Sequence, residues 1–240
     1  MMGKVDELPL VSVITVTFNA DKSILACINS VKNQSYPNIE HIIIDGLSTD
    51  NTVELIKQNS VAFLLSEPDK GIYDAMNKAT LYAKGEWVLF LGADDTLLTG
   101  FSELCYKLKN KDYVYYGDCK MEHKIIGGSY NAYRLAKFNI CHQSIFYPKS
   151  VFDRYHYNLK YKVRADHDLN IRLYANSNLT FKHYKILVAN FGPDGYSSVY
   201  CDHAFFDDQD EIIKQNFNSS TYLRYKIRKL RHLIKGKKNK

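Results

Sequence analysis

Four short apolar runs alternate with segments of helical periodicity in the first part of the chain, and this alternation constrains the fold more than any other feature. The runs are unbroken or rich in β-branched residues, which is typical of strands buried on both faces of a sheet. They occupy residues 10–18, 39–45, 61–65 and 87–91. Between them, the spacing of apolar side chains predicts helices over 22–36, near 53–56 and over 72–83. The pattern predicts an α/β fold with a doubly wound, mostly parallel central sheet flanked by helices.

The chain beyond residue 99 lacks this regular alternation. It contains helix-like segments at 101–109 and 167–175, and strand-like segments at 113–119, 140–147 and 181–189. A glycine-bearing loop over 190–198 follows, which is either a mobile loop near a site or a surface turn. We expect this half to extend the sheet as a mixed C-terminal part of the same domain.

Charge is unevenly distributed along the 240 residues, whose formal net charge is +6. Residues 221–240 contain nine Lys and Arg and no acid, so the rest of the chain has 23 basic against 26 acidic residues. Four apolar residues of this tail share one helical face: Leu223, Ile227, Leu230 and Ile234. The tail is either a solvated charged helix or an amphipathic anchor on an anionic membrane surface, and we favour the anchor. Nucleic-acid binding is not expected, because the chain has no recognisable motif for it.

The remaining composition favours the cytoplasm. Five cysteines are scattered without a CxxC pair, which argues against a disulfide framework or a zinc site. No apolar run approaches the roughly eighteen residues that span a bilayer. The first residues lack the arrangement of a signal peptide, because acids and Pro9 precede the first apolar run. We therefore expect a cytoplasmic protein whose basic tail attaches it to the inner face of the cell membrane.

Two adjacent carboxylates, Asp94 and Asp95, follow the apolar run 87–91. Ligands of open α/β sheets collect beyond the carboxyl ends of the strands, and carboxylate oxygens suit a hard divalent cation. These acids predict a metal site for a phosphate-bearing substrate, although an acidic turn after a strand is the simpler alternative. A phosphatase of the haloacid dehalogenase type does not fit, because its first motif acid would fall on Ala93. A dinucleotide-dependent dehydrogenase does not fit either, because no GxGxxG follows the first strand.

Four motifs in order, VSVITVTFN, IIIDGLSTDNT, SEPDKGIYDAMNKA and FLGADD, resemble those of inverting nucleotide-sugar glycosyltransferases of family 2. The resemblance is strong over residues 10–98 and looser to about 198, and it is greatest to the bacterial polysaccharide-biosynthesis branch. It implies the GT-A fold, with a Rossmann-like sheet. Residues 1–220 would form a single domain, in which 10–98 bind the nucleotide sugar and 99–200 form the acceptor side. The basic tail 221–240 would follow.

For the nucleotide, the resemblance implies contacts at the ends of the first two strands. Asp45 would hydrogen-bond the uracil ring of a UDP-sugar, and the backbone around Thr17 and Asn19 would frame the same base. The alternative for Asp45 is a strand-end acid that holds a turn.

For the diphosphate, the resemblance implies a cation and a metal ion. Lys70 is the candidate cation, because Met76 stands where many relatives carry an arginine; a solvated surface lysine is the alternative. Asp95 would bind Mn²⁺ or Mg²⁺, and Asp94 would contact the metal or the ribose. Such a cation stabilises negative charge on the departing diphosphate.

On the acceptor side, VRADHDLNIRL resembles the family's second acidic motif. Asp166 would be the base that takes the proton from the acceptor hydroxyl, and Asp168 would be a supporting acid. Asp166 is also a natural N-cap for the helix that follows. His142 and Gln143 resemble a His-Gln pair near the acceptor pocket, whereas a lone histidine more often has a structural role.

The sequence therefore predicts a metal-dependent transferase that moves a sugar from a UDP-sugar to a hydroxyl of a glycan acceptor, with inversion. The implied acceptor is a lipid-linked intermediate of cell-surface polysaccharide synthesis, such as capsule, O-antigen or exopolysaccharide. The alternative from another class is a catalytically inactive α/β module that binds membrane or a partner through residues 224–240. The intact Asp94, Asp95 and Asp166 argue against that alternative.

Overall fold

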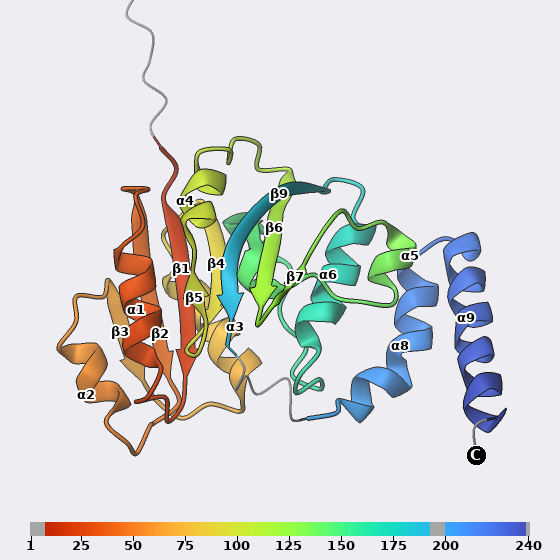
Figure 1. Cartoon of the computed structure of the whole chain (residues 1–240), viewed down its shortest axis with the longest axis horizontal. Coiled ribbons are helices and arrows are strands. Elements are labelled where there is room, and N and C mark those ends of the chain that lie inside the picture. Colours follow the sequence, from red (N-terminus) through yellow and green to blue (C-terminus); the bar gives the residue numbers. More distant parts are fainter. Residues whose placement is uncertain (1–7, 193–199, 239–240) are drawn as a thin grey trace, which may run out of the picture.

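A nine-stranded mixed sheet runs through the molecule, and helices cover both of its faces (Figure 1). The structure is a computed structural model that describes residues 8–192 and 200–238. The strand order is β3-β2-β1-β4-β8-β6-β9-β5, with β7 paired to β6. The strands are β1 (Val11–Thr17), β2 (Ile39–Asp45), β3 (Phe63–Ser66), β4 (Trp87–Gly92), β5 (Thr96–Leu97), β6 (Tyr113–Met121), β7 (Lys124–Ile126), β8 (Ile145–Pro148) and β9 (Thr180–Phe191). The helices are α1 (Ile24–Lys32), α2 (Thr52–Lys57), α3 (Ile72–Tyr82), α4 (Thr99–Cys105), α5 (Ala132–Leu135), α6 (Ala165–Ala175), α8 (His203–Asn216) and α9 (Ser219–Lys238), with 3₁₀ turns η1 (His142–Ser144) and η2 (Lys149–Asp153).

The first four strands form the parallel half of the sheet, which confirms the predicted doubly wound pattern. β1 pairs in parallel with β2 on one side and with β4 on the other, and β2 pairs in parallel with β3. In this register Thr17 lies opposite Asp45, and Asp45 lies opposite Ser66. The carboxyl ends of these strands therefore meet at one edge, where polar side chains follow each strand.

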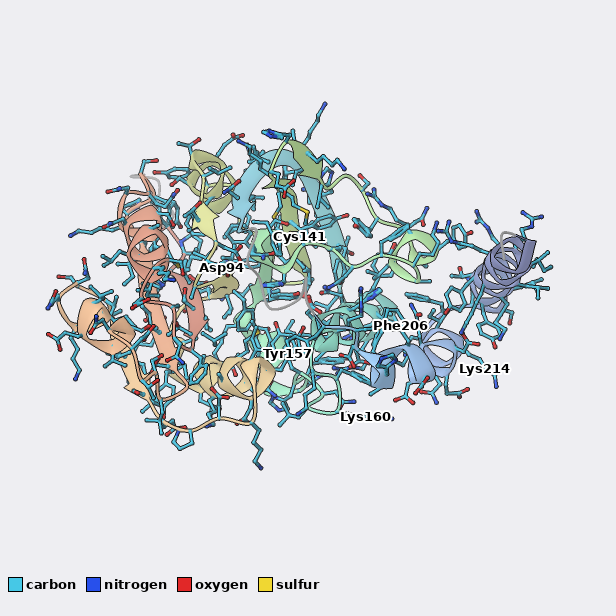
Figure 2. All side chains as sticks on the ribbon, turned by 60° about the horizontal axis from the view of Figure 1, so that its bottom comes forward. Asp94, Cys141, Tyr157, Lys160, Phe206 and Lys214 are labelled. Atoms are coloured by element: carbon cyan, nitrogen blue, oxygen red, sulfur yellow. The ribbon has the colours of Figure 1, made fainter. Side chains whose placement is uncertain are left out.

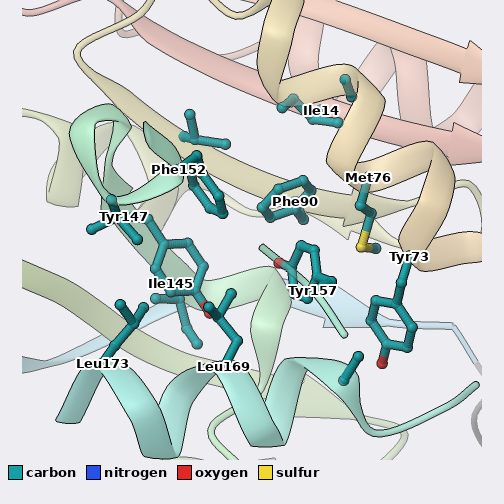
Figure 3. Close-up of a cluster of buried hydrophobic side chains, with 14 of the residues drawn as sticks. Ile14, Tyr73, Met76, Phe90, Ile145, Tyr147, Phe152, Tyr157, Leu169 and Leu173 are labelled. Carbon is teal, nitrogen blue, oxygen red and sulfur yellow. The ribbon is translucent and has the colours of Figure 1, made fainter. Parts of the chain in front are cut away.

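The apolar run of β4 is unbroken because both of its faces are covered. Trp87, Leu89 and Leu91 belong to the core beneath α1 and α4. Val88 and Phe90, which point the other way as strand geometry requires, belong to the core beneath α3 and α6. In that second core Phe90 packs edge-on against Tyr157, and Tyr73 extends from α3 toward α6 (Figure 3).

The second half of the sheet is mixed, as predicted. β8 is antiparallel to β4 and to β6, whereas β9 is parallel to β6 and antiparallel to β5. The strand predicted at 140–147 is wrong in its first part, where the chain forms the turn η1 before β8. Ser144 closes that turn by donating from both its N–H and its hydroxyl to the Cys141 carbonyl. β9 runs on through Phe191, and residues 193–198 of the predicted loop lie outside the described residues.

Two helices complete the chain beside α6, and the first of them was not predicted. α8 begins at an N-cap, Asp202, whose side chain accepts from the Phe205 N–H, and it buries Phe205 and Ile213. α9 packs on α5 and α8 and forms one extreme end of the molecule (Figure 1). Within the described part of the chain, no helix is both long and apolar enough to cross a bilayer.

Candidate active site

Asp45 is the centre of a polar corner at the ends of β2 and β3. Its side chain is fully buried and has no exposed surface. One oxygen accepts from the Ser48 hydroxyl at 2.5 Å, and the other accepts from the Ser66 hydroxyl at 2.6 Å and the Ser48 N–H at 3.0 Å. The turn-holding role weighed for this acid is therefore present. Its predicted contact with a base stays a prediction.

The end of β1 joins the same corner through Asn19. Asn19 has a φ of 49°, and its N–H donates to the Ser48 hydroxyl at 2.8 Å while its side-chain oxygen accepts from the Thr49 N–H at 2.8 Å. Thr17 is buried, and its carbonyl accepts from the Gly46 N–H at 2.9 Å. Hydrogen bonds thus join the loops that follow β1 and β2, which carry the residues predicted to bind the nucleotide. Ser48 and Thr49 form hydrogen bonds within this corner, and the N-cap residue of α2 is Asn51.

Beside this corner the structure exposes an aromatic ring that the sequence analysis missed. Phe18, between Thr17 and Asn19, is 62% exposed, and its ring lies against Gly46. The ring is thus open to solvent at the end of an otherwise buried strand. The signal in the sequence was only its place at the end of β1.

The two lysines near α3 differ in their surroundings. Lys78 forms two ion pairs, because its ammonium lies 2.8 Å from the Glu67 carboxylate and 3.6 Å from the Asp74 carboxylate. Lys70 is exposed and lines a shallow hollow with Tyr73 and with Lys162 from the second half of the chain. Lys70 is therefore the more available cation of the two, and its predicted contact with a diphosphate stays a prediction.

Asp94 and Asp95 form a tight turn immediately after β4. Asp95 is 2% exposed, and its carboxylate accepts from the Gly92 N–H at 3.0 Å and from the Gly192 N–H at 2.8 Å. Asp94 is half-buried. Gly192 passes so close that a Cβ there would lie 2.3 Å from the Asp94 carbonyl oxygen, so this position requires glycine. The end of β9 therefore holds the acidic turn in place.

Gln143 connects this acidic turn to the second half of the molecule. Its side chain is buried, and its Nε2 donates to Asp95 Oδ2 at 2.7 Å while its Oε1 accepts from the Cys141 thiol at 3.1 Å. Figure 2 places Asp94 and Cys141 in the middle of the molecule, where the two halves of the sheet meet. The predicted acceptor-side residue Gln143 thus contacts the predicted metal acid directly.

His142, the neighbour of Gln143 in η1, reaches the predicted base. His142 Nδ1 lies 3.5 Å from Asp166 Oδ2. The same carboxylate accepts from Asn139 Nδ2 at 2.7 Å and lies 3.1 Å from the Tyr73 hydroxyl. Asp166 lies in the first turn of α6, whose N-cap residue is Arg164, so the alternative role of Asp166 as N-cap is wrong.

His142 and Asp166 change each other's pKa. Burial by itself lowers the pKa of the His142 imidazole and raises that of the Asp166 carboxyl. For both groups the other interactions together outweigh burial. Asp166, with smaller contributions from Asp95 and Asp94, raises the pKa of His142, and His142, with smaller contributions from His167 and Tyr73, lowers that of Asp166. At neutral pH Asp166 is ionised, which is the form that a proton acceptor needs.

Asp168 belongs to a different side of α6. Its carboxylate accepts from Arg172 Nε and Nη2, both at 2.9 Å. Burial raises the pKa of Asp168, Arg172 lowers it, and the nearby Asp208 of α8 raises it. The structure therefore places Asp168 in an ion pair that supports α6, and its predicted acceptor role stays a prediction.

The donor set at the end of β4 fits a hard divalent cation. The described residues contain no group of three or more His, Cys, Asp and Glu side chains that could enclose a metal. Such a cage is not needed for Mg²⁺, which commonly takes one or two carboxylates together with substrate phosphates. Asp94 and Asp95 offer two carboxylates at the carboxyl edge of the sheet, where a phosphate-bearing ligand would lie.

Tyr73 and Asn139 are two further site residues that the sequence analysis missed. Tyr73 stands in the distinctive α3 motif but 93 positions from Asp166, and Asn139 stands 27 positions before it. Asn139 also accepts from Asn170 of α6 at 2.9 Å. The only signal for Asn139 was its place shortly before the Cys-His-Gln segment, and no periodicity marks it.

The chain matches known proteins in sequence over most of its length. The sequence model of glycosyl transferase family 2 matches residues 12–171. A protein of Mycobacterium bovis (strain BCG / Pasteur 1173P2), a PGL/p-HBAD biosynthesis glycosyltransferase, is 36% identical over 214 residues, which are 82% of each chain.

Solved structures match it in fold. Staphylococcus aureus TarS 1–349 in complex with UDP-GlcNAc superposes with a TM-score of 0.72 at 18% identity, covering 90% of this chain and 70% of that one. The match covers 42% of a longer TarS chain. The mannosyltransferase PcManGT from Pyrobaculum calidifontis, in complex with GDP-Man and Mn²⁺, superposes with a TM-score of 0.60 at 17% identity, covering 78% and 59%.

Proposed function

The chain belongs to glycosyl transferase family 2 and is a nucleotide-sugar glycosyltransferase, and we propose that it moves one sugar from a UDP-sugar to an acceptor hydroxyl with inversion. The observation that carries this proposal is the chain of contacts from Asp95 through the Gln143–His142 turn to Asp166. It brings a phosphate-facing acidic edge and an ionised carboxylate into one site. An inverting displacement needs that combination.

Asp166 is the proposed base. The acceptor oxygen forms a bond to the anomeric carbon while the bond from that carbon to the diphosphate oxygen breaks, and UDP leaves with the electron pair. The proton of the acceptor hydroxyl passes to Asp166. Asn139, Tyr73 and His142 hold the carboxylate from three sides, so that it is oriented before the substrates bind.

Asp94 and Asp95 are the proposed ligands of a divalent cation, Mn²⁺ or Mg²⁺. Bound there, the ion would neutralise charge on the diphosphate as the leaving group departs. The Mn²⁺ in the PcManGT complex, a protein of the same fold, is in line with this proposal. Lys70 is the proposed second cation for the diphosphate, at the mouth of the hollow beside α3.

The nucleotide is proposed to lie over the ends of β1 and β2. The exposed Phe18 ring offers a stacking surface for the base, and Thr17 and Asn19 supply backbone around it. Asp45 is proposed to hydrogen-bond the base edge; because its side chain has no exposed surface, this contact requires the Ser48 hydroxyl, which donates to Oδ1, to move aside. TarS, which shares the fold, is seen with UDP and with UDP-GlcNAc.

The proposed acceptor is a sugar-bearing, lipid-linked molecule. The mycobacterial relatives carry names from PGL/p-HBAD biosynthesis, not from capsule or O-antigen synthesis, so the acceptor class proposed here is broader than polysaccharide intermediates. We also propose that residues 1–220 act as one domain, with the donor bound by 10–98 and the acceptor by 99–200. The basic helix α9 would hold the enzyme at the inner face of the cell membrane.

The experiment that tests this function is incubation of the full chain with Mn²⁺ and a panel of UDP-, GDP- and TDP-sugars, with release of the nucleoside diphosphate as the readout. One UDP-sugar should be hydrolysed slowly without acceptor and faster with a lipid-linked sugar. Turnover of a GDP- or TDP-sugar with no turnover of any UDP-sugar would contradict the proposed donor.

A further inference from the structure

A cluster of cations and aromatic rings joins α5 and the residues just after it to α9. Lys137 Nζ and Arg224 Cζ lie 4.0 and 4.3 Å from the centre of the Tyr133 ring. Lys137 Nζ and Arg228 Cζ each lie 5.5 Å from the centre of the Phe138 ring. We call these five residues the α5–α9 patch. Its cations come from two elements that are distant in sequence.

The positive charge of this patch is not balanced by acids. Burial lowers the pKa of Lys137, and Arg228, Arg224 and Arg134 lower it further, as expected where like charges gather. No ion pair among the described residues includes Lys137, Arg224 or Arg228. A group of uncompensated cations is a binding surface for an anion.

The two cationic flanks of α9 differ in this respect. On the flank toward α8, Lys226 and Lys229 each lie 2.6 Å from a carboxylate oxygen of Asp210. On the flank toward α5, Arg224 and Arg228 lie over aromatic rings, and neither forms an ion pair with a described acid. The helix therefore directs its uncompensated charge to one side.

The outer face of α9 is apolar and exposed. Thr221 and Tyr225 are buried against the body of the protein, which fixes the rotation of the helix. Four apolar residues consequently face outward and form a stripe: Leu223 (60% exposed), Ile227 (43%), Leu230 (58%) and Ile234 (50%). Arg224 stands three residues before Ile227, the spacing of neighbours on a helix surface, so the patch borders the stripe at this point.

We propose that the α5–α9 patch binds the phosphate group of an anionic phospholipid, while the apolar stripe enters the boundary between headgroups and acyl chains. A nucleic acid would satisfy the cations but would leave the stripe in water, whereas an anionic membrane satisfies both. The inference deepens the proposed function and rests on it, because Phe138 is followed by Asn139, which donates to Asp166. Membrane docking at the patch would bring a lipid-linked acceptor toward the base.

The test is sedimentation of the full chain with vesicles of phosphatidylcholine alone and of phosphatidylcholine with phosphatidylglycerol. The Arg224→Gln/Arg228→Gln variant should lose about thirtyfold in affinity for the anionic vesicles. The matched control, Lys226→Gln/Lys229→Gln, removes the same charge from the same helix and should lose much less. Lys137→Gln, which lies outside α9, should lose about fivefold.

Three results would overturn the proposal. The first is equal loss in the two double variants, because binding would then depend on net charge alone. The second is no loss from Lys137→Gln, because α5 would then take no part. The third is unchanged vesicle binding by Leu230→Gln together with equally tight binding of a DNA oligonucleotide, because the stripe would then have no role.

The proposed function can fail separately. Hydrolysis of a UDP-sugar in solution needs no membrane, so it should be the same in wild type and in Arg224→Gln/Arg228→Gln. If wild type turns over no nucleotide sugar but binds anionic vesicles through Arg224 and Arg228, the donor proposal fails and the patch stands.

Discussion

The two halves of the molecule build their parts of the site in different ways. In the parallel half, acids reach the site because a strand ends there: Asp45 ends β2, and Asp94 and Asp95 follow β4. In the mixed half, the site residues lie on a short 3₁₀ turn and on the first turn of α6, and side-chain hydrogen bonds hold them. Backbone topology positions the donor side, whereas side-chain pairing positions the acceptor side.

The acids of the two halves also differ in their partners. Asp45 and Asp95 are buried among hydroxyl, amide and backbone donors. Asp166 and Asp168 lie beside cationic or protonatable groups, His142 and Arg172. This difference suits an acidic edge that recruits a cation with its substrate, facing a carboxylate that His142 helps to keep ionised. The predictions below test this division, beginning with the largest effect.

Asp166→Asn should separate bond formation from donor binding. The amide keeps the size of the side chain but cannot take the proton, so the rate of sugar transfer should fall by roughly a hundredfold to ten-thousandfold. The affinity for UDP, measured by calorimetry, should stay within about threefold of wild type, a difference of less than about 1 kcal/mol. Normal transfer by this variant would show that the acceptor half does not supply the base.

Gln143→Leu should weaken the link between the halves. Removal of a buried hydrogen bond to the charged Asp95 should lower the free energy of unfolding by about 1.5–3 kcal/mol, measured by urea denaturation. UDP binding in Mn²⁺ should weaken as well, because Asp95 loses a fixed partner. Gln209→Leu is the matched control, since Gln209, on α8 and away from this turn, is also buried and donates to the carbonyl of Ala136 at the end of α5. Equal effects of the two variants on UDP binding would remove Gln143 from the site.

Phe18→Ala tests the donor half alone. Loss of a stacking ring should weaken UDP binding by about 1–3 kcal/mol in calorimetry and leave thermal stability nearly unchanged, because the ring is 62% exposed. Leu81→Ala, at a position 78% exposed on α3, should change neither quantity. A destabilised Phe18→Ala with normal UDP affinity would make this ring structural.

His142→Gln should shift a pH profile more than it changes a rate. His142 lowers the pKa of Asp166, so its removal should move the acid limb of kcat/KM to higher pH. Stability should change with pH in a matching way. Because the pKa of His142 is raised from 6.5, its contribution to stability is complete below pH 6.5 and is lost as the pH rises through the folded-state pKa. Because the pKa of Asp166 is lowered from 3.8, its contribution is complete above pH 3.8 and is lost as the pH falls through the folded-state pKa. Between pH 3.8 and 6.5 both contributions are present, so the loss of stability in the variant should be largest in this range. An equal loss at every pH would contradict the proposed interaction between His142 and Asp166.

The sequence was most informative where local pattern and global fold coincide. The unbroken run Trp87–Leu91 predicts a doubly covered strand, and two acids after such a strand predict a site at its end. The mixed half offers no equivalent rule. The turn η1 depends on the Ser144–Cys141 hydrogen bonds. Helix α8 has a polar, acid-rich sequence whose few apolar residues pack only after folding. The position of the Asp166 carboxylate depends on hydrogen bonds from Asn139 and Tyr73. Asn139 and Tyr73 are 27 and 93 positions from Asp166, and contacts over such distances in sequence leave no periodic signal.

The central claim is that the acidic turn after β4 binds the donor diphosphate through a divalent cation. Calorimetric titration of the wild-type chain with UDP, with and without Mn²⁺, tests it most directly, with Asp94→Asn as the comparison because Asp94 is half-buried and Asp95 is part of the folded turn. Wild type should bind UDP much more tightly with Mn²⁺, and Asp94→Asn should lose most of that gain. Equal UDP affinity with and without Mn²⁺, or a full gain in the variant, would contradict the claim.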